Sequence, residues 1–330
     1  MRLKITLRRI YLSLFLSDAN RIPIMKLILV NLILFLSYSL VSAQEFIPLW
    51  PKGEMPNSKG IELKEIIKNN RILQVDTPGI YTFFTSNEEN TGGAVLICPS
   101  GGYHHLTYDL GGFQLAKWFN TIGMNAFVLI YRLPTSPDLQ TRQTGPLQDA
   151  QRAMKIIRAN AERWHIFKNN VGCLGASSGG HVASTLSTFS EDYSEIGDSL
   201  DTIAFLPDFQ ILISPVITMG TYAHKGSVMN LLGANPSEDL IKKYSNELNV
   251  TSSTPPCFIA DAEDDKVVNP ENSLLYFEAL LKNHVPASLH VFPFGGHAIN
   301  LTGNPGSTQL WIALCEAWLK EMEFNKIKER

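Results

Sequence analysis

The sequence predicts an α/β fold with a mostly parallel central sheet and helices on both of its faces. Three observations support this. Apolar segments of about five residues alternate with amphipathic segments along most of the chain. The short segments are apolar throughout, as strands are when helices cover both faces of a parallel sheet. A Gly-x-Ser-x-Gly sequence at 175–179 lies between one such segment and an amphipathic one, which is typical of a strand–turn–helix corner.

Each predicted strand is a continuous apolar run, and each predicted helix has apolar residues three or four positions apart. The proline near the start of the longest helix favours a helix N-terminus there. The segment Phe46–Asn57 is Pro-rich and is predicted to be irregular. The predicted strands are Ala94–Cys98, Ala126–Tyr131, Val171–Leu174, Phe209–Ser214, Cys257–Asp261 and Ser288–Phe292, and the predicted helices are Gly112–Ile122, Pro146–Trp164, His181–Leu186, Asn272–Lys282 and Leu310–Met322.

One segment, Thr218–Thr254, interrupts this alternation and carries clusters of Gly, Asn and Ser. We expect residues 218–254 to form a small cap over the strand ends, where sites lie in sheets of this kind. We expect residues 44–330 to form a single domain.

The N-terminal segment resembles a signal peptide. Met25-Lys26 precedes an apolar run, Leu27–Val41, and the small residues before Gln44 fit a cleavage site. Cleavage is predicted after Ala43, which makes residues 1–43 a signal and the protein exported, either periplasmic or secreted. Residues 1–24 are expected to be an over-extended start, the alternatives being a long charged leader or a retained anchor. After cleavage no stable membrane insertion is expected.

Composition excludes several classes. The chain of 330 residues has a formal net charge of −3, and its first 43 residues are basic, so the remainder is more acidic still. Without basic clusters it is a poor candidate for binding nucleic acid or anionic membranes. Of the four cysteines, Cys98, Cys173 and Cys257 lie in apolar runs and Cys315 in a predicted helix, so buried free thiols are expected. No ligand spacing for zinc is present, and no metal site is expected.

Ser177 is the candidate nucleophile. At positions 175 and 179 the strand and helix backbones of an elbow approach so closely that a Cβ would collide, which requires glycine. The serine hydroxyl then stands on a strained corner above a helix N-terminus, a geometry suited to a nucleophile whose product is an oxyanion. The alternative is a glycine-rich turn in another kind of α/β protein.

A base and an acid are expected after later strands, in the chain order Ser, Asp, His. His297 directly follows the last predicted strand and is the candidate base. Three aspartates compete for the acid: Asp265 is favoured, Asp264 is the runner-up, and Asp261 lies nearest the strand end. A calcium loop is disfavoured, because Lys266 stands where such a loop needs glycine.

The loop Pro99–Tyr103 is the candidate for an oxyanion hole. The amide of Ser178 is the expected first donor, and Gly102, with Gly101 second, supplies the other from this loop. An ordinary glycine turn is the alternative. Tyr103 and His104 are candidate substrate-binding residues, with His105 beside them.

Other polar residues are given structural roles or none. His181 is expected to pack beneath a strand. Arg132, at the end of a buried strand, is expected to form a structural ion pair with Asp149. No partner can be named for His165, His224, His284 or His290.

Taken together, these pieces resemble the α/β-hydrolase superfamily. More narrowly, the chain resembles exported bacterial esterases related to acetyl xylan and feruloyl esterases, often called BD-FAE-like, from about Ile47 to Trp318. The segments that carry the resemblance are Cys98–Tyr103, Tyr131–Leu133, Asp149–Ala153, Gly175–His181, Asp264–Val268 and Gly295–His297.

The chain departs from the family pattern at three places. Ser100 replaces the first glycine of a Pro-Gly-Gly-Gly-Tyr loop, Ser178 replaces a common alanine, and Asp261-Ala262 replaces a His-Gly-like pair.

The resemblance implies a serine carboxylic-ester hydrolase that acts through an acyl-enzyme on acetyl or feruloyl esters of carbohydrates, without a cofactor. Its partner would be a small-molecule or oligosaccharide ester. Two alternatives stay open: a peptidase of the prolyl-oligopeptidase type, and a binding protein on an inactive hydrolase scaffold.

Overall fold

The computed structural model describes residues 44–297 and 299–325. The predicted signal peptide, residues 1–43, lies outside the described residues. From Phe46 onward the described residues form one compact unit. No helix in this part of the chain combines the length and the apolar character that crossing a bilayer requires.

One sheet organises the described residues, and its strand order is β1-β4-β6-β5-β7-β8-β9-β10. From β6 to β10 neighbouring strands are parallel, whereas β1 and β4 are antiparallel at one edge. The mostly parallel sheet that was predicted is therefore confirmed. The strands are β1 (Phe46–Pro48), β4 (Gly79–Phe83), β5 (Ala94–Cys98), β6 (Asn125–Ile130), β7 (Val171–Ala176), β8 (Gln210–Ile213), β9 (Cys257–Ala262) and β10 (Ala287–Phe292).

The antiparallel strands were not predicted. Phe46–Pro48 lies in a segment expected to be irregular but pairs with β4 in the register Ile47↔Ile80. A second, two-stranded sheet joins β2 (Ile66–Lys68) to β3 (Arg71–Gln74). Each of these strands has three to five residues, which is too short to give a clear periodicity.

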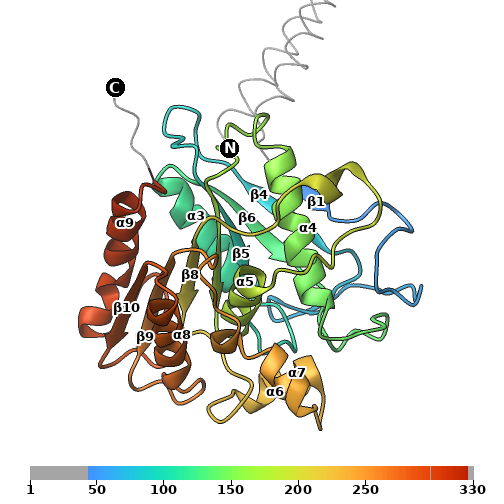
Figure 1. The fold of residues 1–330 in the computed structure, drawn as a ribbon. Coiled ribbons are helices and arrows are strands. Elements are labelled where there is room, and N and C mark those ends of the chain that lie inside the picture. Colours follow the sequence, from blue (N-terminus) through green and yellow to red (C-terminus); the bar gives the residue numbers. More distant parts are fainter. Residues whose placement is uncertain (1–43, 298, 326–330) are drawn as a thin grey trace, which may run out of the picture. The chain divides into compact units, whose positions relative to one another are not determined.

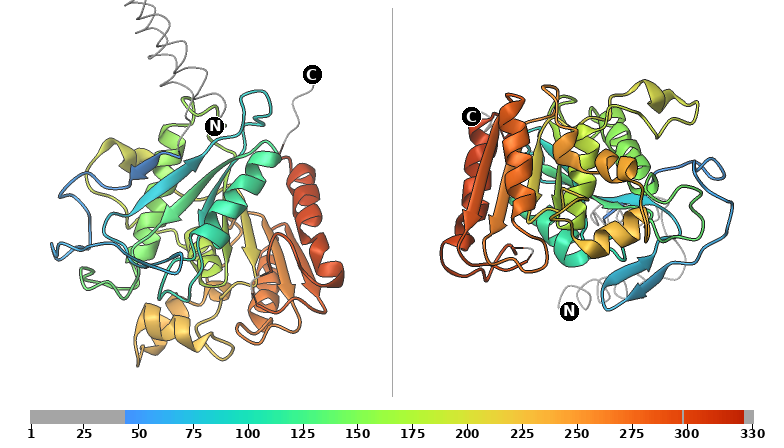
Figure 2. Two further views of the ribbon diagram at one scale, coloured as in Figure 1. Left: turned by 180° about the vertical axis from the view of Figure 1, so that it is seen from behind. Right: turned by 60° about the horizontal axis from the view of Figure 1, so that its bottom comes forward.

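Helices cover both faces of the large sheet (Figures 1 and 2). On one face lie α4 (Gly145–Ala159), α5 (Ser178–Thr188) and α8 (Glu271–Lys282). On the other lie α3 (Gln114–Thr121), preceded by the π-helical turn Asp109–Phe113, and α9 (Trp311–Glu321). This confirms the predicted layers.

Most helix boundaries differ from the predictions by one or two residues, and two differ by more. The segment predicted as Pro146–Trp164 is helical only to Ala159. The backbone N–H and the side-chain amide of Asn160 both donate to the carbonyl of Ile156, and the chain continues in turns. The helix predicted to begin at His181 begins instead at Ser178, directly after the elbow serine.

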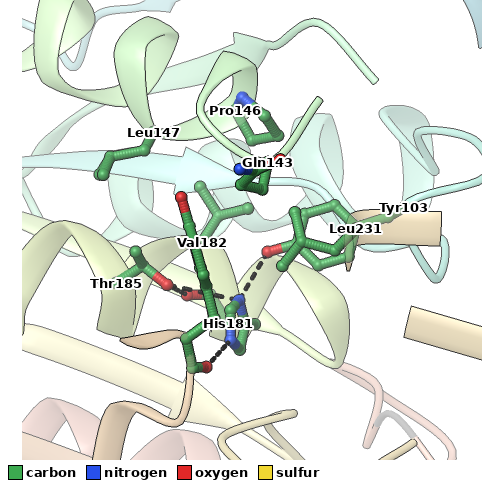
Figure 3. A pocket seen from close by; sticks show the side chains of 9 residues that line it. Tyr103, Gln143, Pro146, Leu147, His181, Val182, Thr185 and Leu231 are labelled. Carbon is green, nitrogen blue, oxygen red and sulfur yellow. Dashed lines mark hydrogen bonds between the residues drawn. The ribbon is translucent and has the colours of Figure 1, made fainter. Parts of the chain in front are cut away.

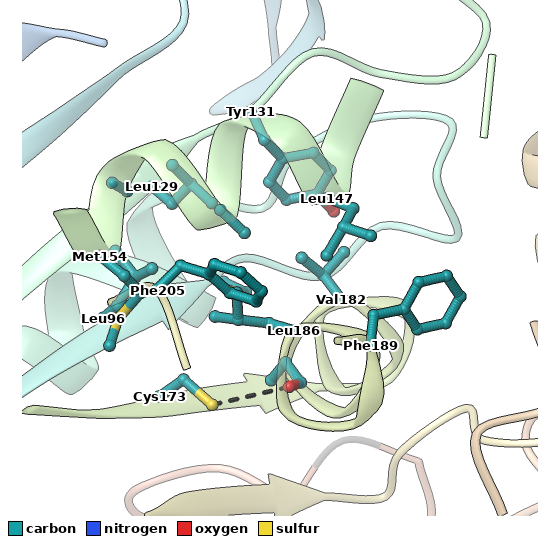
Figure 4. Close-up of a cluster of buried hydrophobic side chains, with 14 of the residues drawn as sticks. Leu96, Leu129, Tyr131, Leu147, Met154, Cys173, Val182, Leu186, Phe189 and Phe205 are labelled. Atoms are coloured by element: carbon teal, nitrogen blue, oxygen red, sulfur yellow. Dashed lines mark hydrogen bonds between the residues drawn. The ribbon is translucent and has the colours of Figure 1, made fainter. Parts of the chain in front are cut away.

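Each face of the sheet has its own apolar core. Figure 4 shows Leu147 and Met154 of α4 and Val182 and Leu186 of α5 packed over the strands, with the thiol of Cys173 among them. All four cysteines are buried and free, as predicted. The elbow helix α5 therefore rests on a rigid layer of side chains.

The predicted ion pair between Arg132 and Asp149 is present, at 2.8 Å, and both side chains are buried. Asp149 also accepts a hydrogen bond from Trp50 Nε1 at 2.9 Å. The pair thus ties the end of β6 to α4 and to the N-terminal segment, which is a structural role.

The segment after β8 leaves the alternating pattern, as predicted, and contains α6 (Lys225–Leu232), α7 (Glu238–Lys243) and the short turn Asn246–Leu248. Figure 1 shows α6 and α7 together at one end of the sheet. Two further 3₁₀ turns, Ser199–Thr202 and Gly306–Leu310, lie in loops.

Candidate active site

The elbow brings β7 and α5 together around Ser177, whose backbone has φ 53° and ψ −124°. Such a conformation is strained for a residue with a side chain and persists only where the surroundings impose it. A Cβ at Gly175 would lie 2.0 Å from the Gly179 carbonyl oxygen, and one at Gly179 would lie 2.1 Å from that of Cys98. Glycine is therefore required at both positions, as the sequence predicted.

The structure brings Ser177, His297 and Asp265 into one hydrogen-bonded line. His297 Nε2 lies 2.8 Å from Ser177 Oγ, and His297 Nδ1 lies 2.7 Å from Asp265 Oδ2. A carboxylate only accepts, so Nδ1 carries the proton and Nε2 is left to accept the serine hydroxyl. This orientation suits proton transfer from Ser177 to His297.

The sheet explains why distant residues meet here. Asp265 follows β9 and His297 follows β10, and these strands are parallel neighbours that end together at Ala262 and Phe292. The Asp265 side chain is fully buried, and its other oxygen accepts the amides of Val267 and Val268 at 2.8 and 3.0 Å.

The other two aspartates of this loop have different partners. Asp264 Oδ1 accepts the amides of Gly295 and Gly296 at 2.9 and 2.7 Å, and so holds the loop that carries His297. Asp261 is buried and accepts hydrogen bonds from Ser273 Oγ and its neighbour's amide. Burial raises the pKa of Asp261 to about 6. Among the three, only Asp265 contacts His297.

The loop Pro99–Tyr103, called the oxyanion loop below after its predicted role, lies beside the elbow because β5 and β7 are parallel neighbours, with Cys98 opposite Gly175. Gly101 and Gly102 have φ values of 139° and 62°, which favour glycine. The Gly102 amide donates to Ser178 Oγ at 2.8 Å. Among the described residues, the amides of Gly101 and Ser178 have no hydrogen-bond acceptor.

The side chain of Tyr103 points away from the surface. Its side chain is 1% exposed, and its hydroxyl lies 2.7 Å from Nδ1 of His181. The backbone at Tyr103 is left-handed, with φ 61°, and the ring lies in the interior. A role of Tyr103 in binding the substrate stays a prediction. His104 is exposed beside His105, and its role in binding stays a prediction.

His181 links three segments beneath the site. Its Nε2 donates to the Tyr244 carbonyl at 2.8 Å, which leaves Nδ1 to accept the Tyr103 hydroxyl. Burial lowers the pKa of His181 to about 4, so the ring is neutral. Figure 3 shows His181 beside Thr185 and Tyr103, in a pocket that Leu147 and Leu231 also line. The expected buried position of His181 is confirmed. Its hydrogen bonds to Tyr103 and Tyr244 were not predicted from the sequence.

Two residues near the site were missed by sequence reasoning. Asn230 of α6 donates to the Gly102 carbonyl at 2.8 Å. The ring of His224, at the start of α6, would lie 3.8 Å from a Cβ built at Gly102. Both contacts join segments more than a hundred residues apart, and no local spacing signals them.

Within residues 44–297 and 299–325, no group of three or more His, Cys, Asp and Glu side chains could hold a metal ion.

Comparison with solved structures supports the fold. An acetyl ester-xyloside bifunctional hydrolase from Caldicellulosiruptor lactoaceticus superposes with a TM-score of 0.73 at 33% identity, covering 86% of this chain and 98% of that one. The α/β-hydrolase fold that the motifs implied is thereby confirmed.

Sequence comparison finds partial matches to two larger proteins. An endo-1,4-beta-xylanase B of Butyrivibrio fibrisolvens is 35% identical over 227 residues, which are 69% of this chain and 35% of that protein. An acetylxylan esterase of Xylanibacter ruminicola is 35% identical over 215 residues, or 64% of this chain and 42% of that protein. The chain thus spans less than half the length of either relative.

The family model described as BD-FAE matches residues 88–280, a range that contains the oxyanion loop, the elbow and Asp265. More than half of the sequence lies within that match, and the predicted resemblance is confirmed: the chain belongs to the BD-FAE family of the α/β-hydrolase superfamily.

Proposed function

We propose that this protein is a serine carboxylic-ester hydrolase that removes short acyl groups, of acetyl or feruloyl type, from carbohydrates. The observation that carries the proposal is the hydrogen-bonded line from Ser177 Oγ through His297 to Asp265, on an elbow that exposes little of the serine. The names of the similar proteins, an acetylxylan esterase and an acetyl ester-xyloside hydrolase, favour acylated xylan fragments.

In this proposal Ser177 attacks the acyl carbonyl while His297 Nε2 takes the hydroxyl proton. His297 then delivers this proton to the leaving alcohol, and the acyl group stays on Ser177. Asp265 fixes the imidazole tautomer and stabilises the imidazolium. Water, activated by His297, releases the acid and restores the serine.

The negative charge that develops on the carbonyl oxygen needs amide donors. We assign this role to the amide of Ser178 together with Gly101 and Gly102. Because a charged acceptor attracts an amide more strongly than a neutral hydroxyl does, the oxyanion competes with Ser178 Oγ for the Gly102 amide.

The segment outside the described residues bears on where the reaction takes place. We propose that the protein is exported after cleavage behind Ala43, so that it meets polymeric or oligomeric carbohydrate outside the cytoplasm. N-terminal sequencing of the native protein tests this, and a first residue other than Gln44 would contradict it.

A panel of substrates tests the activity. We expect release of acetate or ferulate from acylated xylo-oligosaccharides and of p-nitrophenol from p-nitrophenyl acetate. An aminoacyl-proline anilide is the control for the peptidase alternative. Anilide cleavage without ester cleavage would replace the proposal with that alternative, and no turnover of any ester would support an inactive scaffold.

A further inference from the structure

We propose that His224 binds the alcohol side of the substrate, with its Nε2–H donating a hydrogen bond to a hydroxyl group next to the ester being cleaved. This inference rests on the proposed ester hydrolysis and names the residue that selects a polyhydroxylated leaving group. Three observations support it: the ring lies beside Gly102, its Nε2–H has no acceptor among the described residues, and its Nδ1 is held by Ser227.

The position follows from α6. His224 is the N-cap residue of this helix, and its ring would lie 3.8 Å from a Cβ at Gly102. Asn230, on the same helix, donates to the Gly102 carbonyl at 2.8 Å. Both contacts are made at Gly102. Asn230 fixes the helix to the loop, and His224, at the N-cap of the same helix, places its ring beside the loop.

The hydrogen bonds of the ring leave one donor free. Nδ1 accepts the Ser227 amide at 3.2 Å and lies 2.9 Å from Ser227 Oγ. Nδ1 therefore has no proton in the neutral ring, and Nε2 carries it. Among the described residues no acceptor contacts this Nε2–H. The ring is half-buried, so the donor is held in one place yet remains reachable.

Glycine at position 226 permits this arrangement. A Cβ there would lie 3.0 Å from His224 Cε1 and 3.5 Å from Nε2. With a Cβ at this position, the His224 ring would have to shift by a few tenths of an ångström.

Electrostatics keep the donor neutral. Burial and, secondarily, the nearby His297 lower the pKa of His224, and Asp265 partly offsets this. A neutral N–H suits the oxygen of a sugar hydroxyl, whereas it gives an anionic group little advantage over water.

Two esters that differ by one hydroxyl group test the proposal. They are cyclohexyl acetate and the monoacetate of trans-cyclohexane-1,2-diol, and the quantity measured is the ratio of their kcat/KM values. The variant is His224→Asn, because asparagine still caps the helix by accepting the Ser227 amide but is too short to reach the substrate. We expect wild type to prefer the diol monoacetate, and the variant to lose about tenfold of that preference.

Asn230→Ala is the matched control, because it loosens α6 from Gly102 but keeps the imidazole. We expect it to lower hydrolysis of both esters alike and leave their ratio within about twofold of wild type. An unchanged ratio in His224→Asn would overturn the proposal. If both esters were also hydrolysed more slowly by the same factor, His224 would act on the loop and not on the substrate. If wild type cleaves neither ester, the proposed function itself fails.

Discussion

Asp264 and Asp265 are adjacent in the chain, yet their carboxylates hold different parts of the His297 loop. Asp265 Oδ2 lies 2.7 Å from the imidazole Nδ1, whereas Asp264 Oδ1 accepts the amides of Gly295 and Gly296. One aspartate orients the side chain and the other orients the backbone that carries it. This division gives the two residues separable effects.

Asp265→Asn should cost far more activity than Asp264→Asn. Asparagine at 265 can present its amide to His297 and favour the wrong tautomer, which in an Asp-His-Ser arrangement costs about 10⁴-fold in kcat. Asparagine at 264 keeps an oxygen acceptor for the glycine amides, so a loss of about tenfold or less is expected. Steady-state hydrolysis of p-nitrophenyl acetate measures both, and the reverse order would contradict the assignment of Asp265.

The two loop glycines should differ in their tolerance of alanine. A Cβ at Gly101 would lie 1.9 Å from the His105 carbonyl oxygen, so Gly101→Ala must displace the loop. At Gly102 the nearest atom is 3.8 Å away, and the cost is mainly that of φ 62°, about 1 kcal/mol. We expect Gly101→Ala to lose about 100-fold or more in kcat and Gly102→Ala less. Thermal unfolding of each variant distinguishes a local change in the loop from a loss of overall stability. A larger loss of kcat in Gly102→Ala than in Gly101→Ala would show that the loop is not held as described.

His181 should make the fold sensitive to acid. Its pKa is about 4 in the folded state because the ring is buried, below the usual 6.5. The folded state disfavours the protonated ring, so the stability contribution is present above pH 6.5 and is lost as the pH falls from 6.5 towards 4. The loss approaches about 3 kcal/mol. Urea unfolding between pH 7.5 and 4.5 should show a shallower pH dependence in His181→Gln, and identical slopes would refute this role.

Ser178→Ala should be mild, in contrast with any change at Ser177. The Ser178 hydroxyl accepts the Gly102 amide at 2.8 Å and is fully buried. Its removal costs one neutral hydrogen bond, about 1 kcal/mol of folding free energy, but frees the Gly102 amide for the oxyanion. We expect kcat/KM for p-nitrophenyl acetate to stay within about fivefold of wild type. A loss of several thousandfold with an intact fold would make Ser178 itself a reacting group.

Local sequence was enough for the parts of the site that depend on local backbone. The elbow around Ser177 requires glycine at fixed spacings, and the strand that enters it, Val171–Ala176, is apolar and buried almost throughout. The predicted parallel strands share this property, because burial on both faces leaves a plain apolar signature.

The remainder depends on contacts that no short stretch encodes. Tyr103 turns inward because Gly101, Gly102 and Tyr103 all have positive φ, a conformation stabilised by partners such as His181. His224 and Asn230 of α6 both lie at Gly102, which is more than a hundred residues earlier in the chain. The edge strand β1 has only three residues, and its pairing with β4 carries no periodicity.

The most direct test of the central claim is acetate release from acetylated xylo-oligosaccharides by wild type and by Ser177→Ala at equal concentration. The account predicts steady release by wild type and a loss of about 10⁴-fold or more in the variant, whose circular dichroism and thermal unfolding match those of wild type. Release by a folded Ser177→Ala variant at a rate near that of wild type would contradict the assignment of Ser177 as nucleophile.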